Sequence, residues 1–167
     1  MPLSEGALYA CYRRMEKPLH NVLYRWLWQA QECQDAIHDA FMRVWEKRAS
    51  VDEAKLDKLV WTTALNLARN RLRWRALWRF AEPDEDTDAS ADDVPLEAAT
   101  RRQRDVQLRA ALATLPQAMR KVLLLSEFGG LGIAEIAQVL GIPPGTVGSR
   151  KHQALARLRA QLKEETP

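Results

Sequence analysis

The chain has 167 residues, 47% of them hydrophobic and 28% charged, and its formal net charge is +3. This length allows one domain or two small ones, the hydrophobic content is sufficient to bury a core, and no apolar stretch approaches the ~20 residues of a membrane span. The charge is unevenly divided, since residues 1–80 hold 14 basic and 9 acidic side chains, residues 81–100 hold 8 acidic and no basic ones, and residues 101–167 hold 11 basic and 5 acidic ones.

Three or four helices are predicted in the first half of the chain. Apolar residues at helical spacing predict one or two helices over Leu8–Trp28, a helix over Gln34–Lys47 and a long helix over Leu56–Arg79. The middle helix has an apolar face, formed by Ile37, Phe41, Val44 and Trp45, which we expect to face the core. Its remaining surface carries Asp35, His38, Asp39, Met42 and Glu46. That surface is either solvated or a docking site for a basic protein helix.

The long helix ends in a run of basic and aromatic residues. This run contains Arg69, Arg71, Arg73, Arg75 and Arg79, interleaved with Trp74 and Trp78. Arginine neutralises phosphate and an exposed aromatic ring stacks on an unpaired base, so the mixture is suited to single-stranded or melting DNA. The alternatives are a solvated helix end for the arginines and core packing for the tryptophans. Among the tryptophans of this helix, we expect Trp61 to lie in the core.

Residues 81–95 are predicted to form a flexible acidic linker. They are bounded by prolines and poor in large apolar groups, so they cannot bury enough surface to offset the entropy of ordering. The linker is either a solubilising tether or a segment that occupies a basic channel on a partner. The two basic regions on either side of it are suited to a polyanionic partner.

Four helices are predicted after the linker: Arg101–Leu115, Gln117–Phe128, Ile133–Leu140 and Pro144–Leu162. The turn between the last two helices contains Gly141, and the final helix begins with a proline, which is the pattern of a DNA-binding helix-turn-helix. The final helix has an apolar stripe for packing and, on another face, Thr146, Ser149, Arg150, Gln153 and Arg157. Those side chains can read base edges and hold phosphates in a major groove. The alternative is a solvated face on an ordinary core helix.

The fold class predicted by these patterns is all-α, with two small helical domains joined by the acidic linker. No phosphate-binding loop, nucleophile motif or metal-ligand spacing is present, so we expect no catalytic residues, no metal, no cofactor and no small-molecule substrate. Cys11 and Cys33 have no CxxC spacing, and His20, His38 and His152 are scattered. With no secretory leader before them, both cysteines are expected to be reduced in a cytosolic protein.

Three stretches together resemble the extracytoplasmic-function (ECF) group of bacterial RNA polymerase sigma factors, in the sigma-70 family. The first is DAIHDAFMRVW at 35–45, and the second is TALNLARNRLR at 63–73. The third runs from LATLP at 112–116 through VLLL at 122–125 to EIAQVLGIPPGTVGSR at 135–150. They follow one another in the family's order and spacing and cover nearly the whole chain.

The resemblance implies a sigma factor that directs core RNA polymerase to promoters and is not itself an enzyme. It implies sigma domain 2 at 1–80, a linker at 81–104 and sigma domain 4 at 105–167. The resemblance implies that polymerase binds Asp35, His38, Asp39, Met42 and Glu46. It implies that the minus-10 element binds Asn66, Arg69, Asn70 and Arg73. The minus-35 element is expected to bind Thr146, Ser149, Arg150, Gln153 and Arg157. It also implies promoter DNA and an anti-sigma factor as partners, in the bacterial cytoplasm.

The chain departs from the family pattern at several positions. His38 replaces a frequent Gln, Gly132 replaces the usual Ser or Thr cap of the first helix of the motif, and Gly148 and Lys151 replace a basic and an apolar residue. Lys151 is expected to extend along the apolar stripe. Two other functions remain compatible with the residues alone. One is a stand-alone dimeric regulator that binds a palindrome, and the other is an interaction module that supports no transcription.

Overall fold

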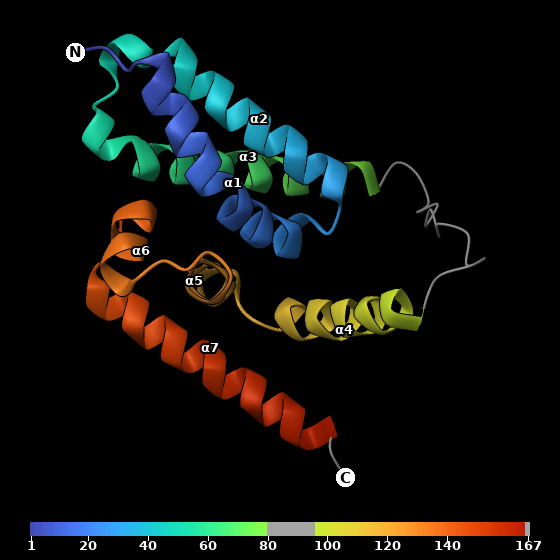
Figure 1. The fold of residues 1–167 in the computed structure, drawn as a ribbon. Coiled ribbons are helices and arrows are strands. Elements are labelled where there is room, and N and C mark those ends of the chain that lie inside the picture. Colours follow the sequence, from blue (N-terminus) through green and yellow to red (C-terminus); the bar gives the residue numbers. More distant parts are fainter. Residues whose placement is uncertain (80–95, 166–167) are drawn as a thin grey trace.

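The computed structural model describes residues 1–79 and 96–165, and within them the chain forms seven α-helices, two 3-10 turns and no strand (Figure 1). The first half contains α1 (Glu5–Leu27), α2 (Ala30–Glu46), the turns Arg48–Ser50 and Glu53–Lys55, and α3 (Leu56–Arg79). The second half contains α4 (Leu96–Ala113), α5 (Gln117–Glu127), α6 (Ile133–Leu140) and α7 (Pro144–Glu165). The all-α prediction is confirmed, and α3 and α6 have the predicted bounds.

The region predicted to be a linker lies largely outside the described residues. Its acidic part, residues 81–95, is not described, and α4 already begins at Leu96, within the range 81–104 that was expected to connect the two domains. The domain limits at 80 and 105 therefore stay a prediction.

Helix α1 is a single helix although it contains Pro18. It begins after Ser4, whose hydroxyl accepts a hydrogen bond from the Ala7 backbone N–H at 3.1 Å, as expected of a good N-cap. It ends at Trp28, whose φ of 57° lies in the left-handed region and whose N–H returns to the Tyr24 carbonyl at 2.7 Å. A left-handed C-cap closes the helix and turns the chain directly into α2.

The core of the first half lies between α1, α2 and α3. Leu19 and Leu23 of α1 are completely buried, as are Ala40 of α2 and Val60 of α3. Trp61 is 5% exposed, which confirms its predicted place in the core. Because the apolar stripes of the three helices face one another, the polar faces of α2 and α3 are left on the surface.

The core of the second half is built by α5, α6 and α7. Leu124, Ile136, Val147 and Ala154 are completely buried there. Helix α4 is attached mainly at its end, where Leu112 is buried and the Gln161 side chain of α7 donates a hydrogen bond to the Thr114 hydroxyl. The start of α4 carries exposed apolar side chains, including Leu96 and Val106.

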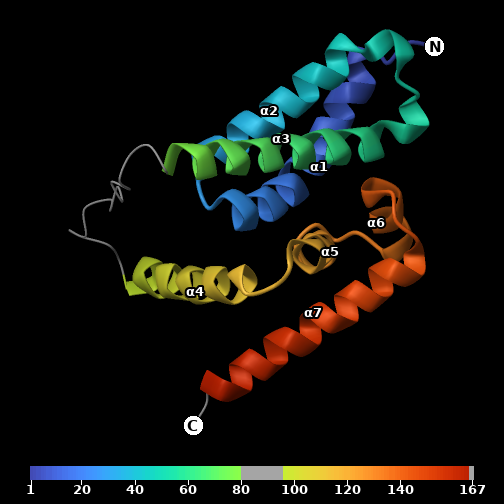
Figure 2. The same cartoon turned by 180° about the vertical axis from the view of Figure 1, so that it is seen from behind.

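The two halves pack against each other, with α6 under α3 and α5 under α1, as both views show (Figure 1, Figure 2). The hydroxyl of Thr62 on α3, which donates to the Lys58 carbonyl at 2.8 Å, also lies 3.4 Å from the Val139 carbonyl of α6. Beside this contact, a Cβ at Gly129 would lie 3.1 Å from Val22 Cγ2 and 2.7 Å from the Leu125 carbonyl oxygen. The absence of a side chain at Gly129 therefore permits the close approach of the C-terminal half to α1.

Substituting Gly132→Ser is expected to stabilise the protein slightly. Gly132 is the N-cap of α6, it has extended backbone angles, it makes no side-chain capping bond, and a Cβ there would meet nothing within 4 Å. A serine hydroxyl can accept one of the free N–H groups of the first turn, which is worth a few tenths of a kcal/mol relative to glycine. Urea denaturation should show a higher midpoint with an unchanged slope. A lower midpoint would contradict the cap geometry.

Candidate nucleic-acid and partner interfaces

The helix-turn-helix predicted at the end of the chain is present. Helix α6 ends at Gly141, which has a φ of 67° and whose N–H bonds to the Ala137 carbonyl. Glycine is favoured there because other residues adopt this left-handed conformation with strain. Helix α7 then begins at Pro144, and Val147 and Ala154 fix it against α5 and α6. The turn and the packing together hold the opposite face of α7 toward solvent.

The expected reading face of α7 is open to solvent. Ser149, Gln153 and Arg157 are exposed, and Thr146 and Arg150 are half-buried. Among the residues that the structure describes, none of these five side chains forms an ion pair or a side-chain hydrogen bond. Their polar groups are therefore available to an external partner. The role of these residues in reading DNA stays a prediction.

Lys151, one of the departures on α7, forms an ion pair. Its Nζ lies 3.6 Å from Glu127 Oε1 at the end of α5, and both side chains are partly exposed. The side chain therefore ties α7 to α5. A pair this exposed contributes at most about 1 kcal/mol.

The arginines of α3 fall into two groups. Arg71 pairs with Asp39 at 3.3 Å, and Arg75 pairs with Glu32 and donates to the Leu27 carbonyl at 2.7 Å. Residues four apart lie on the same helix face, so these two arginines hold α3 to α2 and to the end of α1. Arg69 and Arg73 are two positions offset and belong to a different face.

The candidate minus-10 residues do not all have the same surroundings. Asn66, Asn70 and Arg73 are exposed, whereas Arg69 is half-buried and its Nε is buried without a hydrogen-bond partner. Arg69 and Arg73 both lie close enough to Lys121 of α5 to lower the pKa of that amine, after the larger effect of its burial. Trp74 is 62% exposed, so it has the exposure that base stacking needs. The side chains of Trp78 and Arg79 lie outside the described residues.

The candidate polymerase-binding residues form a ridge along α2. Asp35, His38, Met42 and Glu46 are exposed, with Met42 at 45%. Asp39 lies on the same ridge, but its carboxylate is engaged by Arg71, and Asp35 accepts a hydrogen bond from the Gln31 side chain at 3.1 Å. The ridge therefore offers free Met42 and Glu46 side chains beside acidic groups that already have partners.

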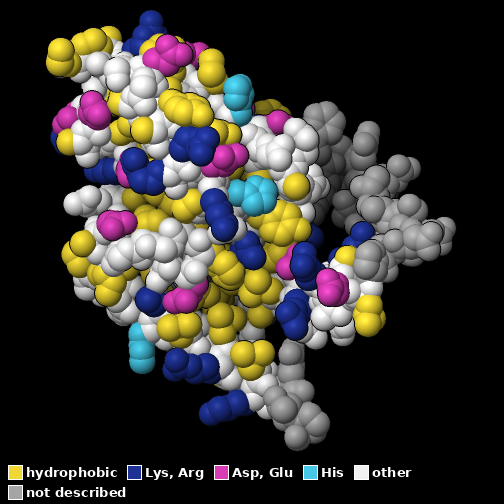
Figure 3. Space-filling view, viewed as in Figure 1, with side chains coloured by type: hydrophobic (Ala, Val, Ile, Leu, Met, Phe, Trp, Pro, Cys, Tyr) yellow, Lys and Arg dark blue, Asp and Glu magenta, His cyan; other side chains and the backbone are white. Residues whose placement is uncertain are grey.

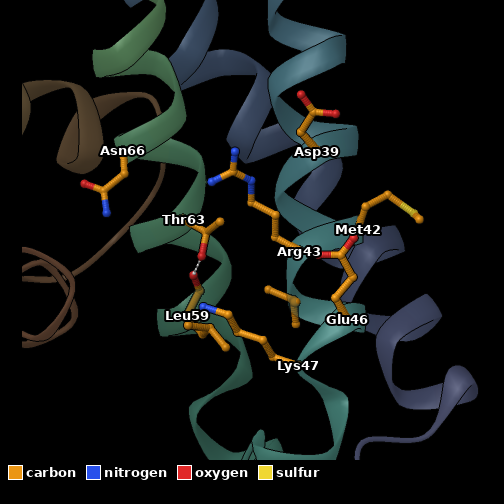
Figure 4. Close-up of a pocket in the computed structure, with 9 residues that line it drawn as sticks. Asp39, Met42, Arg43, Glu46, Lys47, Leu59, Thr63 and Asn66 are labelled. Atoms are coloured by element: carbon orange, nitrogen blue, oxygen red, sulfur yellow. Dashed lines mark hydrogen bonds between the residues drawn. The ribbon is translucent and has the colours of Figure 1, made fainter.

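A groove of 710 Å³ separates this ridge from α3 (Figure 4). The α2 side contributes Asp39, Met42, Arg43, Glu46 and Lys47, and the α3 side contributes Leu59, Thr63 and Asn66. Arg43 extends from α2 into the groove toward α3, whereas Met42 points away (Figure 4). The groove thus has Arg43 and Lys47 on its α2 side and Asn66 at its α3 edge, and it borders the ridge directly.

Sequence reasoning did not identify Arg43, Lys47 and Thr63 as candidate site residues. Arg43 lies four positions after Asp39 on α2, Lys47 directly follows Glu46 at the end of α2, and Thr63 lies three positions before Asn66 on α3, so each lies beside a residue that was identified. What the sequence lacked was the knowledge that these faces of α2 and α3 border one groove.

The buried thiols are not reactive groups. Burial, with a smaller effect of the nearby Asp57 carboxylate, raises the pKa of Cys11 to about 12, and burial raises the pKa of Cys33 to about 11. Both thiols therefore stay protonated near neutral pH. Among the described residues, no group of His, Cys, Asp and Glu side chains is arranged to hold a metal ion. Within the same residues, no helix has the length and apolar character needed to cross a membrane.

Two family models match this sequence. Residues 11–79 match the model described as Sigma-70 region 2, and residues 105–158 match the one described as Sigma-70, region 4. The sequence is 34% identical over 137 residues to the ECF RNA polymerase sigma factor RpoE of Cereibacter sphaeroides, which covers 80% of the chain and 72% of that protein. It is 28% identical over 162 residues to the ECF RNA polymerase sigma factor SigW of Bacillus subtilis, which covers 87% of the chain and 83% of that protein.

Two solved structures have a similar fold. One is the structure of CnrH in complex with the cytosolic domain of CnrY, with a TM-score of 0.75 and 20% identity over 98% of this chain and 92% of that one. The other is the sigma factor RpoE in complex with the anti-sigma factor NepR from Bartonella quintana, with a TM-score of 0.60 and 18% identity over 95% of this chain and 93% of that one.

Proposed function

The chain belongs to the ECF group of sigma-70 family RNA polymerase sigma factors, and we propose that three of its surfaces divide the work of initiation. As a sigma factor, it is a non-enzymatic subunit that directs transcription initiation, with region 2 binding the minus-10 element and region 4 the minus-35 element. Our proposal concerns which side chains of this chain carry those contacts. It rests chiefly on the groove between α2 and α3, which Asn66 lines together with the basic side chains of Arg43 and Lys47.

The minus-35 element is assigned to the exposed face of α7. Arg150 and Gln153 are the side chains suited to read bases, because arginine donates in a fork to guanine and glutamine pairs with adenine. Thr146, Ser149 and Arg157 are suited to phosphates. Support comes from the exposure of Ser149, Gln153 and Arg157 and from the absence of competing partners for all five side chains within the described residues.

The minus-10 element is assigned to the groove between α2 and α3. Extruding a base from a duplex costs a few kcal/mol, which contacts in a pocket must recover. The Asn66 amide can both donate to and accept from a base edge, and Arg43 and Lys47 can neutralise the flanking phosphates. Asn70 and Arg73 continue the polar surface along α3, and exposed Trp74 can stack on an unpaired base.

Core polymerase is assigned to the α2 ridge, with Met42 and Glu46 as its main contacts. An exposed methionine beside acidic groups suits a basic and partly apolar partner helix. Because the same ridge borders the groove, polymerase bound there stands next to the captured base. This proximity couples promoter opening to the enzyme that uses the open strand.

Simultaneous binding of the minus-10 and minus-35 elements requires the two halves of the chain to separate. The two promoter elements lie about 25 base pairs apart, which is about 85 Å of duplex at 3.4 Å per base pair. A domain of this size has a radius of gyration of only about 12 Å. Since α3 packs on α6 in this structure, the arrangement described here is a closed form that must open during initiation.

We further propose an anti-sigma factor as a regulatory partner and the bacterial cytoplasm as the site of action. The first proposal is supported by the similarity of the fold to a sigma factor in complex with the anti-sigma factor NepR. The second is supported by the bacterial sigma factors that this chain resembles.

The test is transcription from a library of templates with randomised upstream sequence, using bacterial core polymerase with and without this protein. Transcripts that depend on the protein and come from templates sharing two separated sequence blocks are the expected result. A dimer that binds a palindrome without polymerase would instead indicate a stand-alone regulator. Polymerase binding with no dependent transcript would indicate an interaction module.

Asn66→Ala is expected to weaken promoter opening about tenfold, because it removes the two-way hydrogen-bonding group from the groove, a loss of about 1–1.5 kcal/mol. Asn66 is exposed, so folding should be unaffected. Permanganate reactivity of unpaired thymines in the polymerase–promoter complex measures the opening. The exposed Gln34→Ala variant is the matched control. Normal opening with Asn66→Ala would contradict the assignment of the groove.

A further inference from the structure

Both halves of the chain contribute to a second cavity, of 280 Å³, which we call the interdomain cavity. Helix α1 and its cap supply Arg25, Trp26 and Trp28, and α3 supplies Arg75. The C-terminal half supplies Arg109 of α4 and Arg120 of α5. The cavity therefore exists only while the two halves are packed together.

The lining of the interdomain cavity is cationic. Four arginines and no carboxylate residue line it among the residues that the structure describes. Among the described residues, Glu32 pairs with Arg75, and Asp105 lies close enough to Tyr24 to raise the pKa of that phenol, after the larger effect of its burial. Arg25 stacks on Phe128 with 4.4 Å between its Cζ and the ring centroid, and Arg109 lies 5.9 Å from the Trp28 ring. Figure 3 shows dark-blue side chains, with yellow ones and some magenta ones among them, on the surface where α1 meets α4 and α5.

Within the described part of the chain, three hydrogen-bond donors of this lining are buried without an acceptor. They are Arg25 Nε, Arg120 Nε and the indole Nε1 of Trp26, whose residue is only 4% exposed. Buried polar atoms in folded proteins nearly always have a partner. Each of these three groups can donate and none can accept, so the missing partner must be an acceptor.

A second group of positive charges lies next to the cavity. Lys121 Nζ lies 5.8 Å from the centroid of the Trp26 ring. Burial, followed by the charges of Arg69 and Arg73, lowers the pKa of Lys121, and burial lowers the pKa of Arg120. The closed arrangement thus brings cations of α3 close enough to the partly buried Lys121 of α5 to lower the pKa of its amine. A bound anion would relieve this repulsion.

We propose that the interdomain cavity binds a phosphate group that bridges α1 to α4 and α5. Phosphate oxygens accept several hydrogen bonds and carry the negative charge that would neutralise the arginines. The volume is below the range of about 300–1,000 Å³ typical of sites for whole drug-sized ligands, so it fits one or two phosphate groups rather than a complete nucleotide. Because the ligand contacts both halves, its binding favours the closed form, and the regulatory consequence rests on the function proposed above.

The binding test uses the full chain and isothermal titration calorimetry with inorganic phosphate, pyrophosphate and a nucleoside triphosphate, each against potassium chloride of equal ionic strength. Pyrophosphate should bind more tightly than phosphate. If the nucleoside triphosphate binds with the same affinity as pyrophosphate, only its phosphates contact the protein. If it binds more tightly, its base also makes a contact, at the mouth of the cavity. Heat that is no larger than that of the chloride control would overturn the proposal.

Two variants test the geometry. Arg109→Gln removes an exposed charge, and Trp26→Phe removes only the buried indole donor and part of its ring. We expect pyrophosphate affinity to fall about tenfold and about fivefold, respectively, in line with hydrogen bonds to charged groups. Arg13→Gln, an exposed arginine elsewhere on α1, should leave affinity unchanged. If all three variants change the pyrophosphate affinity by the same factor, the binding is non-specific electrostatic attraction and the proposed site is wrong.

Closure is read separately by energy transfer between dyes on the two halves. Lys17→Cys on α1 and Arg159→Cys on α7 are exposed positions, and the native thiols are buried and protonated, so the dyes attach selectively. Saturating pyrophosphate should increase the transfer, and Trp26→Phe should reduce that response. Binding without any change in transfer would overturn the bridging role. Both readouts omit polymerase and promoter, so they are independent of the transcription experiment.

Discussion

Met42→Ala combined with Glu46→Lys is expected to abolish co-elution of the protein with bacterial core RNA polymerase. The pair removes the exposed apolar side chain of the α2 ridge and reverses the charge of its free carboxylate. Losing an apolar interface contact and reversing a complementary charge together cost about 2–4 kcal/mol, which is a reduction in affinity of about 30- to 1,000-fold. Size-exclusion chromatography detects the loss, and fluorescence titration gives its size.

The choice of these two positions follows from the contacts inside the chain. Asp39→Arg appears to be the simpler change, but it would place a second cation beside Arg71 and disturb the packing of α2 on α3. Glu46 is the last residue of α2, where a positive side chain interacts favourably with the helix dipole, so Glu46→Lys should not destabilise the helix. Glu97→Lys, an exposed change of equal charge on α4, is the control. Undiminished co-elution of the double variant would refute the assignment of the ridge.

Arg150→Ala combined with Gln153→Ala is expected to weaken binding of the assembled polymerase to its promoter by about 2–5 kcal/mol. Each base-edge contact is worth about 1–3 kcal/mol, and because neighbouring contacts do not add fully, the pair is expected to cost less than the sum of about 2–6 kcal/mol. Polymerase binding should be unchanged, because α2 is untouched. Filter binding of the complex to a promoter recovered from the template library, at a fixed salt concentration, gives the affinity. The single variants apportion the loss, with Arg150→Ala alone expected to cost about 1–3 kcal/mol.

Arg159→Ala provides the matched control for the recognition helix. It is exposed on the same helix, and nine positions after Arg150 it lies on the opposite side at 3.6 residues per turn. It should change promoter affinity little. If Arg159→Ala and the double variant weaken binding equally, the effect is general electrostatic attraction and α7 does not read sequence as assigned. A parallel loss of polymerase binding would also contradict the division of roles.

The helices themselves were predictable from the sequence. Apolar spacing predicted α3 and α6 at their observed bounds, because each has a stripe of apolar residues at helical spacing and α6 also lies between Gly132 and Gly141. Gly141 was readable as a C-cap, because the turn needs a left-handed residue. The family was predictable from three local stretches, because their order and spacing can be recognised without any tertiary information. The family models for sigma-70 regions 2 and 4 match the parts of the chain that contain these stretches.

The role of individual charged residues was only partly predictable. In the sequence, five arginines of α3 form one basic run, but the fold directs Arg71 and Arg75 to carboxylates of α2 while Arg69 and Arg73 approach Lys121. Helical periodicity separates these two pairs but does not say which neighbour each will meet. Lys151 was expected to extend along the apolar stripe, and the fold also gives its Nζ an ion pair with Glu127 that the sequence did not indicate.

Local sequence thus determined the helices, the turn of the helix-turn-helix and the family, because these depend on spacing within one segment. Tertiary structure alone decided what lies between segments. The groove that places Arg43 opposite Asn66, the packing of Gly129 on Val22 and the unpartnered donors of the interdomain cavity each join residues from different helices. Such contacts depend on the relative placement of whole helices, which is set by the summed packing of many apolar side chains and not by any one motif.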